Sequence, residues 1–312
     1  MFDIKHQFSF MKYKNYYYII SVAIIVLGIG IGMIRGYNYG IDFTGGTMMQ
    51  LDMGKQVTAS DVTQLQKVLK SDKIDADIVV AGKDGDQVII KTVQALDTAA
   101  REEALGKVND EFGLDNSAVM TIEQFGPSVG DMLKANAVKA VIIASVGMLI
   151  YICIRFEWKF GLASIAAVLH DVFVLIAFYG IFHMPINNPF IAAVLTIVGY
   201  SIMDTIVIFD RVRENLGIMK KSKLEELIDH SINQTLGRSL MTSVATVTAI
   251  IPLAILGGET VRNFTLPLII GITAGTCSSI FIASPLYFQL CLATSGSKYK
   301  AKKKKSRSRI EE

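Results

Sequence analysis

GYSIMDTIVIFDRVREN, residues 199–215, is an apolar stretch that contains one aspartate and then runs into alternating charges. Asp204 lies inside the apolar part, about 22 Å along a helix that starts at Pro189 and rises 1.5 Å per residue. Thr196 and Tyr200 precede Asp204 at four-residue steps, so the three side chains share one helical face. Because an ionised carboxylate in hydrocarbon costs about 3 kcal/mol on insertion scales, we expect this face to contact protein or water rather than lipid.

Five further apolar blocks of similar length occupy the chain, which has 312 residues, 51% of them hydrophobic. Each block approaches or exceeds the roughly 20 residues that a helix needs to cross a bilayer. Gly28, Gly30 and Gly32 in the first block favour close packing against another helix. The sequence therefore predicts a polytopic α-helical membrane protein with six transmembrane helices, at Tyr16–Ile34, Ala135–Ile154, Phe160–Phe182, Pro189–Phe209, Ser239–Gly257 and Phe264–Ala293.

Lysines and arginines in the short loops predict the orientation of the spans, because such residues concentrate on the cytoplasmic side. Three lysines precede the first span, and basic residues recur in the loops at 155–159 and 211–223, whereas the loop HMPINN (183–188) has none. The first block is too long for the apolar part of a signal peptide, so we expect an uncleaved anchor. The expected order is a cytoplasmic N-terminus (1–15), the first span (16–34), an external segment (35–133), spans two to six with short loops (134–293) and a basic cytoplasmic tail (294–312).

The net charge of +3 conceals two regions of opposite sign. Residues 35–133 hold 9 basic and 16 acidic residues, a net −7, whereas the rest of the chain holds 22 and 12, a net +10. The basic residues flank membrane spans, so we assign them to topology and to contact with anionic membrane lipid, and we expect no nucleic-acid partner. The three cysteines all lie in predicted spans without a CxxC spacing, which argues against disulfides and a zinc site.

The external segment alternates between strand-like and helix-like patterns. Thr58, followed three residues later by Asp61, opens one helix, and Asp97 and Gly113 bound a second. The order strand–helix–strand–strand–helix–strand predicts an extracytoplasmic α+β domain of the ferredoxin-like type, with one antiparallel sheet and both helices on one face. The predicted strands are GTMMQLDM (46–53), ADIVVAG (76–82), QVIIKTV (87–93) and SAVMTIEQFG (117–126), with a KDGD hairpin turn between the second and third.

Glycine-rich segments join this domain to the membrane on both sides. GIDFTGG (40–46) lacks the Lys-Ser or Lys-Thr of a phosphate-binding P-loop and follows no strand. We interpret the two segments as hinges on which the domain pivots, and the domain surface either as simply solvated or as a weak holder of unfolded polypeptide. The hinge residues are Gly40, Asp42, Gly45 and Gly46 on the first side and Gly126 and Pro127 on the second.

A second charged residue of the membrane region, Arg238, starts the fifth span, and Thr242 and Thr246 continue its face. The alternating topology places Arg238 at the depth of Asp204, so a pair between them would offset part of the cost of burying each charge. Such a pair has two interpretations: a static salt bridge, or an acid that exchanges a proton. Burial disfavours the anion and a nearby arginine favours it, so a balanced Asp204 can bind and release a proton as its surroundings change.

His170 and Asp171 stand side by side near the middle of the third span. Adjacent helical residues project about 100° apart, so the two cannot face one partner helix equally. We expect one to pair within its own neighbourhood and the other with a second chain, either as a proton-coupling pair or as packed polar residues. A metal site built from these two residues and Asp204 has no fixed ligand spacing, and we expect no metal.

Four stretches carry a resemblance to known proteins: GIDFTGG after the first span, HDV in the third, GYSIMDTIVIFDRVREN in the fourth and SINQTLGRSLMTS at the start of the fifth. Together they resemble the SecF family of bacterial protein-export subunits, which is grouped with SecD in the resistance–nodulation–division superfamily. The likeness covers residues 10–290. The family usually has Asn immediately before its membrane acid, whereas this chain has Met203, which cannot supply that amide.

The resemblance implies a SecD partner with six similar spans and a larger external domain, in the bacterial cytoplasmic membrane. It implies that Asp204 and Arg238 are the family's membrane acid and arginine, and that proton flow moves the external domains. These domains would draw unfolded polypeptide outward after the SecYEG channel and SecA have begun its passage, with no enzymatic reaction and no cofactor besides the proton. Two alternatives stay open: a proton-coupled exporter of lipid or small molecules, and a passive scaffold with static polar pairs.

Overall fold

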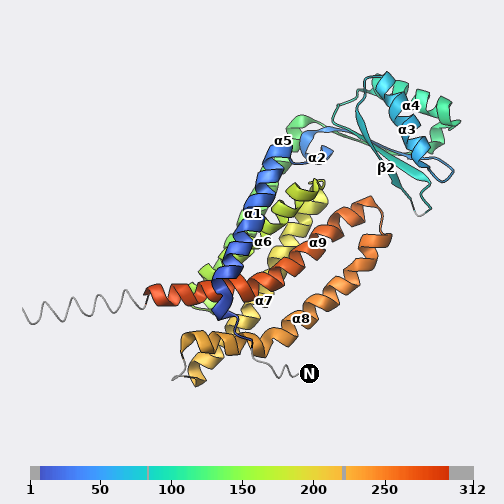
Figure 1. Cartoon of the computed structure of the whole chain (residues 1–312). Coiled ribbons are helices and arrows are strands. Elements are labelled where there is room, and N and C mark those ends of the chain that lie inside the picture. Colours follow the sequence, from blue (N-terminus) through green and yellow to red (C-terminus); the bar gives the residue numbers. More distant parts are fainter. Residues whose placement is uncertain (1–7, 83, 220–222, 295–312) are drawn as a thin grey trace, which may run out of the picture.

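The structure, a computed structural model, describes residues 8–82, 84–219 and 223–294. It has two parts, a bundle of long helices and a small domain of strands and short helices beyond one end of the bundle (Figure 1). Lys5 in the expected cytoplasmic N-terminus, part of the basic loop at 211–223 and the tail from residue 295 lie outside the described residues.

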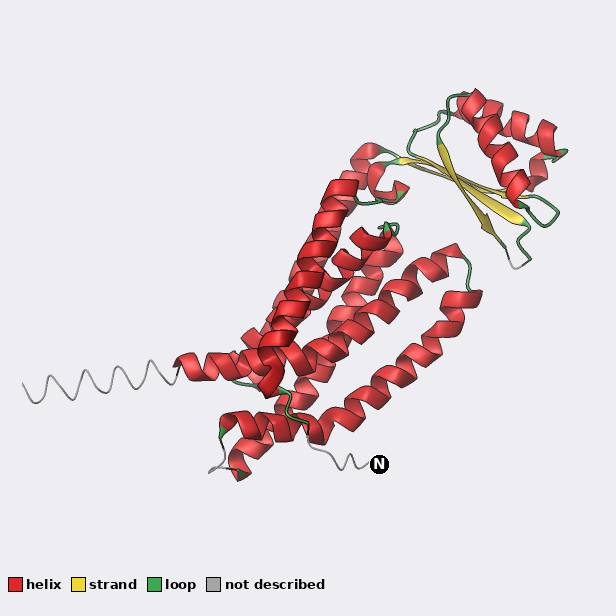
Figure 2. Ribbon diagram, viewed as in Figure 1, coloured by secondary structure: helices red, strands yellow, loops and turns green. Residues whose placement is uncertain are grey.

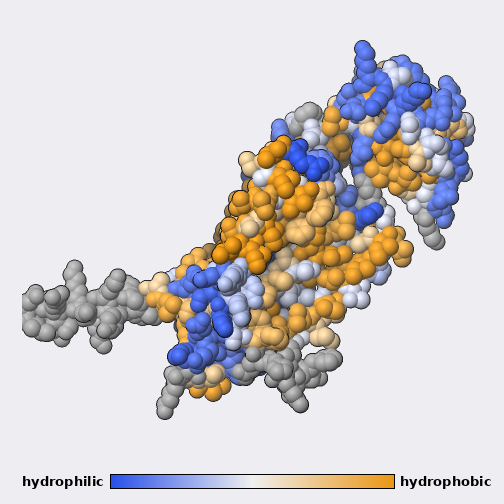
Figure 3. Space-filling model, in the orientation of Figure 1, coloured by the Kyte–Doolittle hydropathy of each residue, from blue (hydrophilic) through white to orange (hydrophobic). Residues whose placement is uncertain are grey.

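Six helices of the described chain are long and apolar enough to cross a membrane, which confirms the six predicted spans. Figure 3 shows apolar side chains over the bundle, between polar surfaces on the external domain and at the base of the bundle. Several helices extend beyond their apolar blocks. They are α1 (Lys14–Arg35), α5 (Pro127–Arg155), α6 (Trp158–Phe182), α7 (Asn188–Ile218), α8 (Leu224–Leu256) and α9 (Glu259–Ser278), the last of which continues through a π-helical turn (Ser279–Ala283) to residue 294.

The helices α7 and α9 are the most buried of the bundle, whereas α1 and α5 lie at its periphery. Small residues bring α1 close to α6: a Cβ at Gly28 would lie 2.5 Å from the Cβ of Ala177, and one at Gly180 would lie 2.6 Å from the carbonyl oxygen of Gly28. Gly32 lies at the same contact, whereas Gly30 faces open space. The predicted packing stripe is therefore used at Gly28 and Gly32, which share a face because they are four residues apart.

The external domain has the predicted strand–helix–strand–strand–helix–strand order. Its strands form one antiparallel sheet in the order β2-β3-β1-β4, and two helices cover one face of the sheet (Figure 2). This arrangement is the predicted ferredoxin-like α+β fold. The elements are β1 (Gly46–Asp52), α3 (Ala59–Ser71), β2 (Ala76–Ala81), β3 (Gln87–Thr92), α4 (Thr98–Phe112) and β4 (Val119–Phe125).

Local sequence signals account for the helix boundaries in this domain. Asp61 donates its backbone N–H to the Thr58 hydroxyl, and its carboxylate accepts the Thr58 N–H at 2.8 Å, which completes a capping box. Asp97 caps α4 by accepting the N–H of Ala100 at 2.8 Å. Gly113 ends the same helix with a φ of +66°, a conformation that favours glycine. Both helices therefore begin where the sequence predicts, and the second also ends at the predicted glycine.

The two predicted hinge segments are ordered and packed in the structure. GIDFTGG contains a short helix, α2 (Ile41–Thr44), and Gly45 and Gly46 then lead directly into β1. On the other side Gly126 is the N-cap of α5, and Pro127 is the first residue of that helix. Pivoting of the domain about these segments stays a prediction.

A cleft of about 530 Å³ lies between the uncovered face of the sheet and the outer end of the bundle. Gln50 and Ile89 line the cleft from the sheet, and Asn188 and Thr260 line it from the first turns of α7 and α9. The helix α2 and the start of α5 therefore connect the domain to the bundle, and the cleft separates the uncovered face of the sheet from the bundle.

Candidate functional site

Asp204, on α7, is buried, with 8% of its surface exposed. Its Oδ1 accepts a hydrogen bond of 2.5 Å from the Ser239 hydroxyl of α8. Its Oδ2 is also buried, and among the described residues no donor meets it with hydrogen-bond geometry, although the Ser279 hydroxyl lies near the carboxyl group. Because a buried acceptor without a donor is costly, a proton or a water molecule bound to this oxygen would relieve that cost.

Arg238 directly precedes Ser239 on α8, yet it forms no ion pair with Asp204 within 4.0 Å in the described chain. The two residues share one region, as the sequence indicated, but the described structure has no direct ion pair between them. Adjacent helical residues project about 100° apart, so with Ser239 facing the carboxylate Arg238 lies beside it at the exposed surface of the bundle.

The carboxylate and the guanidinium instead line one small cavity, with a volume of about 60 Å³. A water molecule takes up about 30 Å³ in the liquid, so the cavity has room for one or two. The geometry therefore allows a water-bridged contact between the two charged groups in place of a direct pair. The cavity is lined by Tyr200, Met203, Asp204, Val207, Arg238 and Thr242.

The polar faces predicted on α7 and α8 meet beside this cavity. The Tyr200 hydroxyl lies 3.3 Å from the Thr246 hydroxyl, and Thr242 lines the cavity below it. Thr196, the remaining member of the predicted α7 face, is exposed, and its hydroxyl donates to the carbonyl oxygen of Ala192 on its own helix. Tyr200 is therefore the first residue of the predicted α7 face that makes a polar contact with α8.

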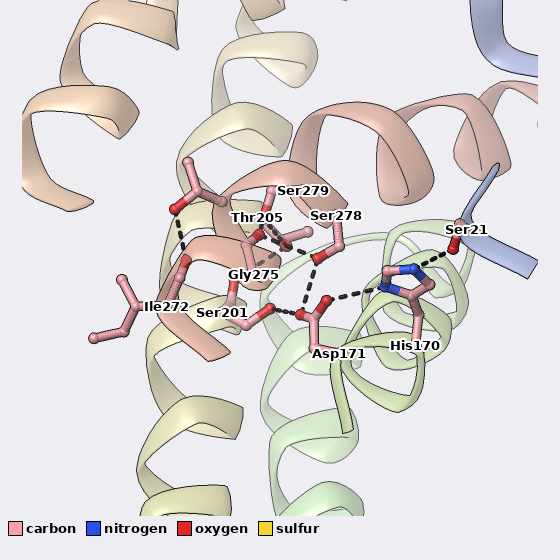
Figure 4. Close-up of polar contacts among 10 residues, drawn as sticks. Ser21, His170, Asp171, Ser201, Thr205, Ile272, Gly275, Ser278 and Ser279 are labelled. Carbon is pink, nitrogen blue, oxygen red and sulfur yellow. Dashed lines mark hydrogen bonds and ion pairs between the residues drawn. The ribbon is translucent and has the colours of Figure 1, made fainter. Parts of the chain in front are cut away.

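Asp171 is the most enclosed acid of the bundle, with 1% of its surface exposed. Its Oδ2 accepts hydrogen bonds from the hydroxyls of Ser201 on α7, at 2.5 Å, and Ser278 on α9, at 2.9 Å. Its Oδ1 lies 3.0 Å from Nδ1 of His170, whose Nε2 contacts the Ser21 hydroxyl of α1 (Figure 4). This network joins four helices, because the acid and the imidazole point toward different neighbours.

Partners for both His170 and Asp171 thus come from within the chain. The sequence indicated a partner within the neighbourhood for one of them, whereas the structure gives both residues partners within the chain, and pairing with a second chain stays a prediction. Two edges of the imidazole explain the difference: Nδ1 reaches back to the adjacent Asp171 while Nε2 faces α1.

A cluster of hydroxyls between the two acids was not expected from the sequence. The Thr205 hydroxyl lies 2.8 Å from that of Ser279, which is near Asp204. Ser278 and Ser279 both donate to the carbonyl oxygen of Gly275, at 3.1 and 2.9 Å, where the π-helical turn begins. Adjacent serines in an apolar span were the only signal, and serine hydroxyls in helices often bond their own backbone.

The structure brings His170 and Asp171 together but does not add Asp204 to them. Among the described residues, no group of three or more histidine, cysteine, aspartate and glutamate side chains is arranged to hold a metal ion. The predicted hinge residues form a separate region at the outer end of the bundle: Gly40, Asp42, Gly45 and Gly46 around α2, and Gly126 and Pro127 at the start of α5.

Two family descriptions match the chain. Protein export membrane protein SecD/SecF, C-terminal, matches residues 105–292, which is more than half of the chain, and the SecD/SecF GG motif matches residues 33–57. The protein translocase subunit SecF of Sebaldella termitidis is 40% identical over 288 residues, which cover 90% of this chain and 91% of that protein. The protein translocase subunit SecDF of Thermus thermophilus is 38% identical, over 92% of this chain and 39% of its own length.

Solved structures agree with these matches. The crystal structure of SecDF, a translocon-associated membrane protein from Thermus thermophilus, superposes with a TM-score of 0.81 at 36% identity and covers 93% of this chain and 39% of that chain. SecDF in the super-membrane-facing form superposes with a TM-score of 0.71 at 33% identity. This multi-pass membrane protein therefore belongs to the SecD/SecF family of protein-export membrane proteins.

Proposed function

We propose that this chain is an accessory subunit of the Sec protein translocase which, together with SecD, uses the proton gradient to move external domains that promote polypeptide export. Relatives named protein translocase subunit SecF, which match over nearly their whole length, support the export role. They are named as translocase subunits rather than as enzymes. The same matches do not favour the alternative of a lipid or small-molecule exporter.

The observation that carries the proton role is the unpartnered Oδ2 of Asp204 beside a cavity that Arg238 also lines. When the acid is ionised, the guanidinium across the cavity favours its charge, and a bridging water can satisfy Oδ2. When the acid is neutral, the proton sits on Oδ2, since Oδ1 is already bonded by Ser239. The two states therefore differ in charge and in the attraction between α7 and α8, while the Ser239 bond is kept.

His170 and Asp171 are a proposed second part of the proton pathway. The His170 imidazole contacts a carboxylate through one ring nitrogen and a serine hydroxyl through the other, so it can pass a proton between them. Their network borders the hydroxyl cluster that leads toward Asp204. The proton is the coupling ion in this proposal, with no other cofactor.

SecD is the proposed direct partner, because SecDF relatives carry the corresponding region within a longer chain. The SecYEG channel, a preprotein driven by SecA, unfolded polypeptide and membrane lipid are the further partners. The proposed setting is the bacterial cytoplasmic membrane, with both termini on the cytoplasmic side.

Export driven by an imposed proton gradient tests the proposal. In vesicles that contain the translocase and the SecD complex, Asp204→Asn is expected to keep assembly with SecD and to lose at least tenfold of the gradient-dependent stimulation. Asp210→Asn, an exposed acid on the same helix, is the matched control and should behave as the unmodified protein. Full stimulation in the Asp204→Asn vesicles would refute proton use at this site.

A further inference from the structure

The short helix α2 lies between the membrane bundle and the external domain and is packed into both. Phe43 is 3% exposed and belongs to the hydrophobic core of the bundle, and Ile41 is also buried. Two residues after Phe43 the chain reaches Gly45 and Gly46, where β1 begins. A Cβ at Gly46 would lie 2.1 Å from the carbonyl oxygen of Thr92, so this end of β1 is tightly packed on the neighbouring strand.

Hydrogen bonds attach α2 to the start of α7. Asp42 Oδ2 accepts the backbone N–H of Asn188, the first residue of α7, at 2.8 Å. Gly40 donates its N–H to the carbonyl oxygen of Ile186 at 2.7 Å, and Ile186 donates to that of Asn38 at 2.8 Å. An acid that accepts a free N–H in the first turn of a helix is also favoured by the helix dipole.

The opposite side of α2 is in contact with α5. A Cβ at Gly130, in the first turn of α5, would lie 2.6 Å from the carbonyl oxygen of Phe43. The backbone of α2 is therefore held between the first turns of two membrane helices, and one of these helices carries Asp204.

We propose that α2 couples α7 to the external domain, with Asp42 as the positioning residue that ties β1 to the start of α7. The inference rests on the proposed function, because it gives the route by which a change at Asp204 reaches the external domain. The helix α7 is continuous from Asn188 to Ile218, so a displacement near Asp204 also moves its first residue. β1 pairs with β3 and β4, so moving its first residues moves the sheet, and the cleft beneath the sheet leaves room for that motion.

The hydrogen bond between Asp42 and the backbone of Asn188 can be removed from either side without changing Asp204. Asp42→Ala removes the acceptor, and Asn188→Pro removes the donor at a first-turn position where proline is tolerated. Asp42→Asn keeps an oxygen that can accept the same bond. Asp131→Ala is the matched control, because Asp131 is an exposed acid near the start of α5 that pairs with Lys134 on its own helix.

Two measurements on the full chain in complex with SecD test the inference. Infrared spectroscopy follows the carboxyl band of Asp204 with pH, and electron–electron resonance follows the distance between spin labels at the exposed Val93 and Phe182, with the native cysteines replaced by serine. In the unmodified complex, the Asp42→Asn variant and the Asp131→Ala control, the distance is expected to shift when the band changes. In Asp42→Ala and Asn188→Pro the band should still change while the shift is lost.

A shift of full size in both Asp42→Ala and Asn188→Pro would overturn the coupling role of this contact. So would an unmodified complex in which the Asp204 band changes and the distance stays constant. If the band itself does not respond to pH in the unmodified complex, the proposed proton function fails first, and the coupling fails with it. The two failures are therefore told apart by which signal is lost.

Discussion

Asp171 and Asp204 are both buried in the bundle, but they differ in how their oxygens are satisfied. Asp171 has donors on both oxygens, from Ser201, Ser278 and His170. One oxygen of Asp204 has no partner among the described residues and borders a cavity. A carboxylate with hydrogen-bond donors on both oxygens gains little from protonation. A carboxylate with one oxygen that lacks a donor gains a partner when it binds a proton or a water molecule. The difference favours Asp204 as the exchanging group and Asp171 as the more rigid one.

Neutral substitutions at the two acids should therefore affect stability differently. In Asp171→Asn, the amide group cannot accept all the bonds that the carboxylate accepts, and each unsatisfied buried group costs about 1–3 kcal/mol. In Asp204→Asn, one of the two replaced oxygens has no hydrogen-bond donor to lose. The free energy of unfolding should therefore stay within about 1 kcal/mol of that of the unmodified protein. Thermal unfolding in detergent measures both variants. Equal losses of stability in Asp171→Asn and Asp204→Asn would show that the number of hydrogen bonds to each acid does not distinguish the roles of the two acids.

The charged members of the site were predictable from the sequence, but their partners were not. Asp204 and Arg238 are conspicuous because an ionised group in an apolar block is costly. Ser239 was not predicted, although it takes the place beside Asp204 that was expected for Arg238. Helical periodicity shows which residues share a face but not which neighbouring helix that face meets, so the missing direct pair could not be foreseen.

At the scale of helices, the contact between α1 and α6 depends on glycine at two positions. Gly28 lies against Ala177 with no space for a methyl group, whereas Gly30 faces open space. Gly28→Ala should separate the helices and cost about 1–3 kcal/mol, as overpacking does. Gly30→Ala should be neutral or stabilising by up to about 1 kcal/mol, because alanine is the better helix former. Thermal unfolding measures the stability of the two variants. A larger loss of stability in Gly30→Ala than in Gly28→Ala would contradict the packing described.

The start of α3 provides a pH-dependent prediction outside the membrane. Hydrogen bonds from Thr58, assisted by Lys55, lower the pKa of Asp61 to about 2, from an ordinary value of 3.8. The folded pKa lies below the unfolded one, so the cap stabilises the helix above about pH 4 and its contribution is lost as the pH falls toward 2. Asp61→Asn should therefore destabilise the external domain at pH 7, with a difference from the unmodified protein that shrinks between pH 4 and 2.

Hydrogen exchange of residues 59–71 in the full chain measures this effect. Asp110→Asn, an exposed acid on α4, is the control and should follow the unmodified protein at each pH. A difference between Asp61→Asn and the unmodified protein that stays constant down to pH 2 would show that the cap does not depend on the ionised acid.

Capping residues allowed both helices of the external domain to be placed from the sequence, since the cap is a local interaction between residues three apart. The ends of the membrane helices were less predictable. Apolar content marks the part of a helix that lies in hydrocarbon, whereas α7 and α8 continue into polar segments, to Ile218 and from Leu224. The packing of α2 was missed for a related reason: the glycines on either side of it indicate freedom in an isolated chain, but Phe43 lies in the core of the bundle.

At the scale of the whole molecule, we expect one face of the bundle to contact another protein. Arg238 is exposed on α8, within a span whose other exposed side chains include the apolar Leu240, Met241 and Val244. An arginine in hydrocarbon is costly, whereas the exposed apolar residues of α5 are satisfied by lipid. The fold class, the number of spans and the external domain followed from composition and periodicity, whereas the face expected to contact a partner could be proposed only from the arrangement of the helices.

Cross-linking tests which face of the bundle contacts SecD. A cysteine at Met241 on α8 should cross-link to SecD in native membranes, whereas a cysteine at Ile143, an exposed apolar residue of α5, should not. The two sites are matched as exposed apolar positions of membrane helices. Efficient cross-linking at Ile143 with none at Met241 would place SecD on another face and leave Arg238 unexplained.

The central claim is that the Asp204 carboxyl group changes between its neutral and ionised forms while it lies inside the membrane. Infrared difference spectroscopy of the SecD complex in lipid, titrated across the pH range that cells tolerate, measures this change directly, with Asp204→Asn to assign the band. We expect a carboxyl band that appears and disappears with pH and is absent from Asp204→Asn. Identical spectra at every pH, with the group held in one form throughout, would contradict the account.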